Sequence, residues 1–223
     1  RQGDSDEYRT AYGEVVLAAI GRVPNTDADW FRSSGLKLDE RGYVTVDGYG
    51  RTNLDGVWAL GDITPGHALA HRAFEQGITI AEKIAGADPK PVIDDTVPQV
   101  VFSFPEAASV GLTLDQAKAL EDVVEPKETA YPMLSNARML MSGEGGSMTV
   151  VSGAFANNPD MQVVLGVHIV SPIASDLIAE AEQLVGNRVP LADAARLIHP
   201  HPTFSETLGE ALLKADGRPL HTR

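Results

Sequence analysis

The first part of the chain contains short apolar runs separated by glycine and proline. The longest run, residues 14–20, is continuous and rich in β-branched side chains, which predicts a buried strand over about 7–20. Residues 44–47 and 57–60 predict two further short strands. From about residue 67 to 85 the apolar positions follow helical spacing, which predicts a helix with these residues on its inner face: Phe74, Ile78, Ala81 and Ala85.

A polar stretch with two prolines, residues 86–91, interrupts this pattern and predicts a linker. Beyond it, strands are predicted at 98–104, 108–111, 122–131, 147–155 and 161–170. The last two strands are joined through a predicted turn at 157–160. Helices are predicted from Thr113, over 172–186, near Pro190 and after Pro202. Because strands and helices do not alternate strictly, this part predicts an α+β domain built on an antiparallel sheet.

The turn before the last helix holds the main candidate for chemistry. Residues 199–206 are His-Pro-His-Pro-Thr-Phe-Ser-Glu, and two X-Pro bonds restrict the backbone there. His201 and Glu206 suit proton transfer, since an imidazole titrates near neutrality and a carboxylate can orient it. A second interpretation remains open, in which Thr203 and Glu206 form a capping box and the glutamate does no chemistry.

Composition narrows the classes of function. The 223 residues are 43% hydrophobic and 22% charged, which is typical of a globular protein. A net charge of −13 disfavours nucleic acid or an anionic membrane as the main partner. No apolar run approaches the ~20 residues of a membrane helix, and the N-terminus lacks the pattern of a signal peptide. We therefore expect a cytoplasmic protein that binds neither nucleic acid nor membrane.

The absence of cysteine excludes disulfides, thiolate metal sites and thiol nucleophiles from this chain. His199, His201 and His221 are metal ligands by type, but the prolines restrict the backbone and no further ligand cluster is visible. No metal site is therefore predicted. Motifs of serine hydrolases, phosphate-binding loops and zinc proteases are also absent.

Several motifs, in order along the chain, resemble those of one family. Residues 199–206 resemble the C-terminal active-site motif of dihydrolipoamide dehydrogenases, in the flavin-dependent pyridine nucleotide-disulfide oxidoreductase family. Residues 51–62 resemble the family's second flavin-binding motif, and residues 166–178 resemble the core of its interface domain. The interface motif departs from the commoner pattern at Ser171 and Ser175, where glycine is frequent.

The resemblance implies a role for the residues of the last turn. His201 would accept a proton from a dithiol substrate, and Glu206 would hold and polarise the imidazole. The resemblance further implies a cis peptide bond between His201 and Pro202.

The resemblance also implies cofactor contacts earlier in the chain. Asp62 would hold the ribityl chain of FAD, and Gly21 would lie beside the nicotinamide cofactor, NAD. The pyrimidine side of the flavin ring would meet the backbone of Ala68, Leu69, Ala70 and His71. For the side chain of His71 we expect a packing and hydrogen-bonding role.

The fold implied by the resemblance is an α/β remnant of the FAD- and NAD-binding domains, followed by an α+β interface (dimerisation) domain with an antiparallel sheet. The implied boundaries are 1–25 for the end of the NAD-binding domain, 26–95 for the C-terminal part of the FAD-binding domain and 96–223 for the interface domain. The interface domain would form a homodimer, with apolar surface left by its sheet and by the helix that contains Ile173 and Leu177.

We therefore expect the C-terminal part of a dihydrolipoamide dehydrogenase that oxidises a lipoyl-bearing protein or a small dithiol. The redox cysteines and the dinucleotide fingerprint would lie in a missing N-terminal half. The isolated fragment would then be inactive and lack bound FAD. Two alternatives stay open: a glutathione- or mycothiol-type disulfide reductase, or a dimerisation module without activity.

Overall fold

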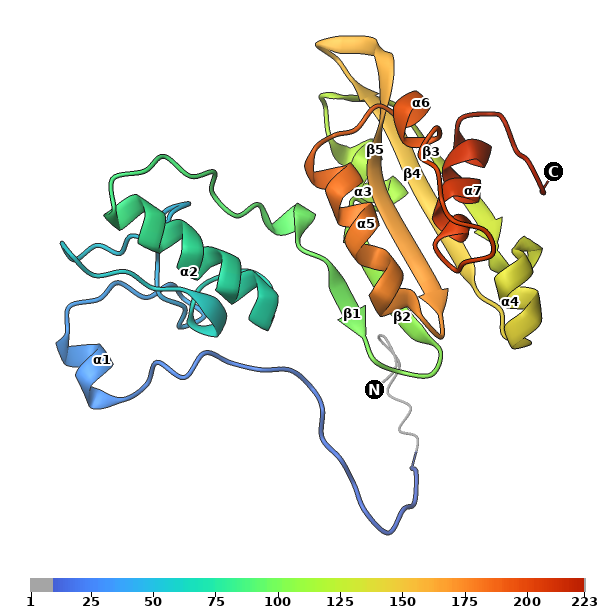
Figure 1. Cartoon of the computed structure of the whole chain (residues 1–223). Coiled ribbons are helices and arrows are strands. Elements are labelled where there is room, and N and C mark those ends of the chain that lie inside the picture. The colour runs from blue at the N-terminus through green and yellow to red at the C-terminus, as the bar shows by residue number, and fades with distance from the viewer. Residues whose placement is uncertain (1–9, 223) are drawn as a thin grey trace.

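An antiparallel sheet dominates the C-terminal part of the protein. The structure, a computed structural model, describes residues 10–222. Its strands are β1 (Gln99–Val101), β2 (Glu106–Gly111), β3 (Val123–Pro132), β4 (Ser147–Phe155) and β5 (Asn158–Ser171). They pair in the order β1-β2-β5-β4-β3, and every pair is antiparallel (Figure 1). The predicted antiparallel sheet is confirmed, and the β4–β5 turn lies at 156–157, slightly earlier than predicted.

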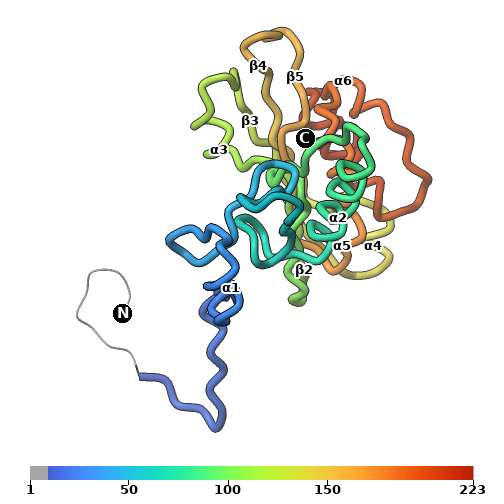
Figure 2. Tube along the Cα trace, turned by 90° about the vertical axis from the view of Figure 1, so that its left-hand side faces the viewer, coloured from blue at the N-terminus to red at the C-terminus, as the bar shows by residue number. Residues whose placement is uncertain are grey.

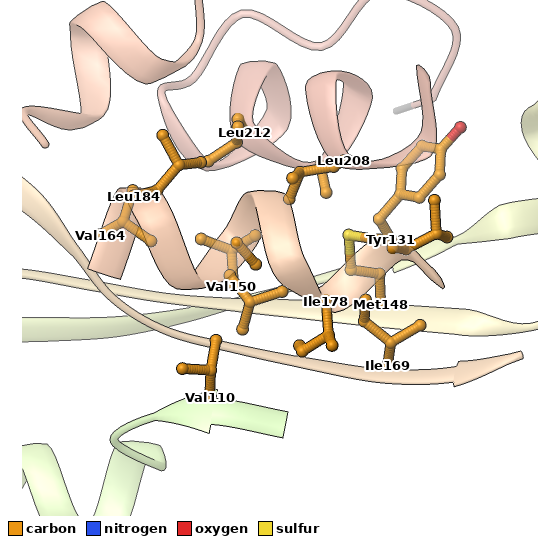
Figure 3. Close-up of a cluster of buried hydrophobic side chains, with 14 of the residues drawn as sticks. Val110, Tyr131, Met148, Val150, Val164, Ile169, Ile178, Leu184, Leu208 and Leu212 are labelled. Atoms are coloured by element: carbon orange, nitrogen blue, oxygen red, sulfur yellow. The ribbon is translucent and has the colours of Figure 1, made fainter. Parts of the chain in front are cut away.

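Helices cover one face of this sheet. Helix α5 (Ala174–Gly186) packs on β2 and β5, whereas α7 (Glu206–Ala215) packs on β3 and β4 (Figure 1). The short helix α6 (Leu191–Ala194) lies between them in the chain. Apolar side chains from the sheet and these helices form the main core (Figure 3); it includes Val110, Tyr131, Met148, Val150, Val164, Ile169, Ile178, Leu184, Leu208 and Leu212.

The opposite face of the sheet has a smaller core at one end. Successive side chains of a strand point to opposite faces, so Val151 and Leu165 lie on the side away from α5 and α7. They pack with Ala117 of α3 (Leu114–Ala119). The capping box predicted at the start of this helix is present, with Thr113 and Gln116 as its members.

The N-terminal part has its own small core around Phe31, Val44 and Ala59. Its elements are α1 (Asp29–Ser33), the 3-10 helix η1 (Gly61–Ile63) and α2 (Ala70–Ile84). A second 3-10 helix, η2 (Asp94–Thr96), leads into β1. The guanidinium Nε of Arg72 in α2 donates to Asp94 Oδ1 at 2.6 Å, which joins this part to the segment that enters the sheet.

The strand predicted over 7–20 is wrong for the residues that the structure describes; residues 7–9 lie outside them. Residues 10–20 are an extended, exposed coil that lies below the other elements in both views (Figures 1 and 2). Val15, Leu17 and Ile20 are almost completely exposed. A strand is stable only where a neighbouring strand pairs with its backbone, and none of the described segments lies beside this run.

The two short strands predicted at 44–47 and 57–60 are also wrong as regular strands. Val44 pairs with Leu38, and Trp58 pairs with Arg51, through single isolated bridges. The side chains of Val44 and Ala59 are nevertheless buried, as a strand interpretation requires. The apolar runs thus indicate burial at these two positions but not ladder pairing, and Val57 and Leu60 in the second run are exposed.

Helix α2 is confirmed, but the face predicted to be buried is wrong. Phe74 is 71% exposed, and Ile78 is also exposed. The buried residues are instead Arg72, Thr79 and Ile80. The apolar stripe has no covering element among the described residues, whereas Arg72 is buried because it forms an ion pair with Asp94. None of the helices over residues 10–222 has the length and apolar composition needed to span a bilayer.

Two short helices were missed by the sequence interpretation, α1 and α4. Helix α4 (Ala137–Ser142) begins after Asn136, whose side-chain oxygen accepts from the Met139 amide at 3.1 Å. It ends at Gly143, which adopts the left-handed conformation. Both are standard helix-terminal residues, so the sequence did contain a local signal for this helix.

Candidate active site

The site is built on the first turn of α7. The apolar positions that predicted this helix are confirmed, since Leu208 and Leu212 are fully buried against the sheet (Figure 3). The helix begins at Glu206, and its N-cap is Ser205. The predicted capping side chain, Thr203, instead donates its hydroxyl to the Pro200 carbonyl at 2.7 Å. The carboxylate of Glu206 is therefore fixed at the start of a helix that is anchored in the core.

His201 and Glu206 form a direct pair. His201 Nδ1 lies 2.8 Å from Glu206 Oε1. A carboxylate only accepts hydrogen bonds, so Nδ1 carries the proton and Nε2 of the neutral ring can accept one. The imidazole is 71% exposed and the Glu206 side chain 20% exposed. The ring thus presents its free nitrogen to the outside. The peptide bond between His201 and Pro202 is cis, as the resemblance implied.

Glu206 makes the contacts expected from both interpretations, one with each carboxylate oxygen. While Oε1 meets His201, Oε2 accepts from the Thr203 amide at 2.7 Å, which is the glutamate half of a capping box. Partial burial alone would raise the pKa of the Glu206 carboxyl, but the hydrogen bonds from Thr203 and His201 and the charges of His201 and His199 outweigh it and lower this pKa. Glu206 is therefore ionised at neutral pH and keeps its acceptor role.

A second histidine of the turn, His199, contacts both α5 and α7. His199 Nε2 lies 2.8 Å from Glu180 Oε1 of α5, and its side chain is only 9% exposed. A Cβ atom on Gly209 would lie 2.6 Å from His199 Nδ1, so the ring packs directly on the backbone of α7. The hydrogen bond to Glu180 raises the pKa of His199, an effect that burial opposes and the charges of Glu180 and Glu206 reinforce.

The His199–Glu180 pair makes stability depend on pH. Because the folded pKa of His199 lies above its unfolded value, the stabilisation is complete below about pH 6.5 and is lost as pH rises through the folded pKa. We expect His199→Gln to lower the free energy of unfolding by about 1–2 kcal/mol at pH 6, a modest loss because Glu180 is partly exposed. The loss should be smaller at pH 8.5, because the stabilisation by the protonated imidazole is reduced there. Urea unfolding of both proteins across this range measures the difference, and a difference that does not vary with pH contradicts the assignment.

A third histidine–carboxylate pair lies further along α7. His221 Nδ1 is 2.8 Å from Glu210 Oε1, and the His221 ring is mostly exposed.

Tyr131 is completely buried, and burial raises its pKa to about 12, with the charges of Glu210 and Glu206 adding to the increase. The phenol therefore stays neutral. Residues 10–222 contain no cluster of three or more histidine, aspartate or glutamate side chains suited to a metal ion.

The residues expected to meet FAD lie together around the start of α2. Gly61 has a φ of +73° and its amide donates to Gln76 Oε1 at 2.9 Å, which turns the chain so that Asp62 is exposed. Helix α2 begins at Ala70 with no side-chain cap, so its first amides and the positive end of its dipole face outward. His71 Nε2 lies 2.7 Å from the Pro98 carbonyl.

This arrangement fits one edge of a flavin. The hydroxyl groups of the ribityl chain of FAD need an exposed acceptor such as Asp62. The pyrimidine edge of the flavin ring becomes anionic on reduction and needs free amides such as those at the start of α2. Gly21 lies apart from these residues in the exposed coil, with a φ of +126° and no atom within 4 Å of the position of a Cβ. The described residues do not bring Gly21 into this group.

The His201–Glu206 pair, called the dyad from here on, and the residues around Asp62 lie in different parts of the molecule. Helix α7 and the neighbouring turn lie on the helical face of the sheet, whereas α2 and η1 belong to the N-terminal part (Figure 1). Sequence reasoning missed the contacts that support the dyad, namely Glu180, Gly209 and Asn136. Gly209 gave a signal as a glycine inside an otherwise regular helix, and Asn136 gave one as a helix N-cap, but neither signal indicates a contact with the turn.

Comparison with known proteins agrees with this architecture. The profile described as "Pyridine nucleotide-disulphide oxidoreductase, dimerisation domain" matches residues 97–212, and that described as "Pyridine nucleotide-disulphide oxidoreductase" matches residues 3–77. The first match alone covers more than half of the chain. The chain belongs to the pyridine nucleotide-disulphide oxidoreductase family, and the expected combination of a cofactor-binding remnant and a dimerisation domain is confirmed.

Several relatives are dihydrolipoyl dehydrogenases. The chain is 41% identical over 208 residues to that of Cupriavidus necator, which covers 92% of this chain and 42% of the relative. It is 38% identical over 216 residues to that of Geobacillus stearothermophilus, covering 96% of this chain and 44% of the relative. The chain therefore spans less than half the length of these curated relatives.

Solved structures show the same fold. LpdA from Mycobacterium tuberculosis superposes with a TM-score of 0.79 at 31% identity, covering 88% of this chain and 42% of that one. The HOCl-induced flavoprotein disulfide reductase RclA from Escherichia coli gives a TM-score of 0.74 at 23% identity, with 87% and 43% covered. The second likeness concerns the fold alone.

Proposed function

We propose that this chain supplies the C-terminal part of an FAD-dependent dihydrolipoyl dehydrogenase, which oxidises a dithiol and passes electrons to NAD. The observation that carries the proposal is the 2.8 Å pair between His201 and Glu206, with Nε2 of an exposed imidazole free to accept a proton. The relatives named dihydrolipoyl dehydrogenase support the same function.

In this proposal His201 is the base. Its Nε2 takes the proton from a thiol of the substrate, which leaves a thiolate able to attack a disulfide. The ionised carboxylate of Glu206 fixes the Nδ1–H tautomer and stabilises the imidazolium that forms. When bound, FAD and NAD supply the electron transfer, and Asp62 with the start of α2 (Ala68 to His71) would hold part of the flavin. Gly21 is proposed to lie beside NAD.

The proposed domain boundaries are 1–25, 26–95 and 96–223. The separate cores on either side of the 86–91 linker support the second boundary. The matches to 3–77 and 97–212 also leave this linker unmatched.

The dyad serves a second subunit in this proposal. Within one chain the dyad and the flavin-contacting residues lie apart, so a homodimer is the assembly in which His201 reaches a flavin site (Figure 1). Within α5, the helix expected to leave apolar surface, Leu177 is itself buried in the core. Exposed apolar side chains lie elsewhere on this domain; they include Val101, Phe102, Phe104, Leu134, Leu140 and Met141.

We expect the 223-residue chain to be a dimer at micromolar concentration, because these apolar side chains need a covering surface. Light scattering coupled to size exclusion gives the mass directly. Replacing Phe102 and Phe104 by serine should shift the equilibrium towards the monomer. A monodisperse wild-type monomer would contradict the proposed assembly.

The function itself is tested with the complete polypeptide, including whatever sequence precedes this chain in the gene. The protein should be yellow and should reduce NAD when dihydrolipoamide is added. Glutathione disulfide and mycothiol disulfide serve as competing substrates for the alternative disulfide reductases. Turnover of either disulfide without turnover of dihydrolipoamide would overturn the proposal. This chain alone should bind FAD weakly, since it lacks the Gly-x-Gly-x-x-Gly fingerprint.

A further inference from the structure

The side chain of Asn136 reaches from α4 to the turn that contains His201. Its Nδ2 donates to the Thr203 carbonyl at 3.2 Å, across 67 positions of sequence, and Asn136 is only 5% exposed. Its Oδ1 accepts from the Met139 amide at 3.1 Å. The two bonds fix the orientation of the amide, because the carbonyl of Thr203 requires a donor and the amide of Met139 requires an acceptor.

Thr203 in turn holds the catalytic carboxylate. While its carbonyl accepts from Asn136, its amide donates to Glu206 Oε2 at 2.7 Å. Glu206 Oε1 meets His201 Nδ1 at 2.8 Å. Three hydrogen bonds therefore connect Asn136, through the backbone carbonyl and amide of Thr203, to Glu206 and the imidazole.

The support on the α4 side is rigid. Met139 is 1% exposed and lies in the main core, so α4 cannot shift without disturbing the sheet. From the same helix, the guanidinium carbon of Arg138 lies 5.4 Å from the centre of the Phe204 ring, which adds a second contact next to Thr203. The turn is thus held by α4 on one side and by His199 with α5 on the other.

We propose that Asn136 is a positioning residue for the proton-transfer dyad: it fixes the backbone of Thr203 and, through it, the tautomer and direction of the His201 ring. The inference rests on the proposed function for its chemical meaning, but the geometry that it describes lies entirely within this chain. A residue that only capped α4 would need its Oδ1 alone, whereas the positioning role needs Nδ2.

Asn136→Asp separates the two roles. Aspartate is as good an N-cap as asparagine, so α4 is retained, but an oxygen replaces the nitrogen that donates to Thr203. Asn136→Ser is the second variant, since serine also caps a helix but is too short and differently placed to replace Nδ2, and it introduces no charge. Glu206→Gln is the positive control for a ring that has lost its carboxylate partner.

The first readout is the ring of His201 in the 223-residue chain, observed through ¹H–¹⁵N correlations of ¹⁵N-histidine and assigned with His201→Gln. The wild-type ring should be mainly in the Nδ1–H tautomer. Both Asn136 variants should lower the ratio of Nδ1–H to Nε2–H about fivefold and move the spectrum towards that of Glu206→Gln, with the thermal midpoint of unfolding nearly unchanged. An unaltered His201 spectrum in whichever of the two variants folds overturns the proposal.

The second readout is activity in the complete enzyme. Dihydrolipoamide oxidation should lose about tenfold in kcat with little change in KM, because a misdirected base slows the chemical step more than binding. Flavin reduction by NADH should be unaffected. If the wild-type enzyme did not oxidise dihydrolipoamide, the proposed function would fail, and the ring spectra alone would still decide for or against Asn136.

Discussion

His201→Gln should lower dihydrolipoamide oxidation by the complete enzyme at least about 100-fold, equivalent to about 2.7 kcal/mol of lost transition-state stabilisation. Glutamine has no nitrogen that takes up a proton at neutral pH, while it occupies a similar volume. Since the imidazole is mostly exposed, its loss should disturb the fold little. Steady-state rates with dihydrolipoamide and NAD measure the effect.

A matched control for this variant is available, because α7 also supplies the carboxylate partner of a second histidine. His221 forms an equally short pair with Glu210, at 2.8 Å, and its ring is similarly exposed. His221→Gln should therefore change the rate less than about twofold. Glu206→Gln should give an intermediate loss of about tenfold, because the ring remains but its orientation and basicity are weakened. A rate in His201→Gln similar to that in His221→Gln would show that His201 is not the base.

Leu208→Ala should lower the free energy of unfolding by about 3 kcal/mol, the typical cost of a large cavity in a close-packed core. Leu208 is 1% exposed and lies between α7 and the sheet, near Tyr131 and Met148 (Figure 3). Few side chains can refill the space, because the surrounding residues are themselves fixed in the core. Urea unfolding at one fixed protein concentration measures the change, since a dimer adds a concentration dependence.

The control for the cavity is Leu220→Ala, because Leu220 is 66% exposed. It should change the free energy of unfolding by less than about 0.5 kcal/mol. A loss below about 1 kcal/mol for Leu208→Ala would mean that α7 is not anchored as described. The dyad would then not stand on a rigid support.

The sequence predicts the C-terminal part of the fold well. Helices α5 and α7 have clear apolar periodicity, and each strand of the sheet lies within a short distance of its predicted range. The pairing of His201 with Glu206 could also be predicted from the sequence, because the two residues are close along the chain and prolines restrict the turn. The order of the strands in the sheet depends on contacts between distant segments, and local patterns do not encode it.

Two of the wrong predictions, the strand at 14–20 and the buried face of α2, share a physical cause. Residues 14–20 and the Phe74 face of α2 are apolar, but apolar patterns predict burial only where a neighbour is present to cover them. The residues that contact the turn from other elements could not be predicted from the sequence, for a related reason. Asn136 and Glu180 meet the turn only after the sheet brings α4 and α5 beside it. No periodicity or spacing in the sequence reports such contacts.

The most direct test of the account uses single turnovers of the complete, flavin-containing His201→Gln enzyme. The oxidised enzyme is mixed anaerobically with dihydrolipoamide in one experiment and with NADH in the other, and flavin absorbance is followed in a stopped-flow instrument. The account predicts flavin reduction by dihydrolipoamide at least about 100-fold slower than in the wild type, and reduction by NADH at the wild-type rate. Equal loss of both reactions would contradict it and would make His201 a structural residue.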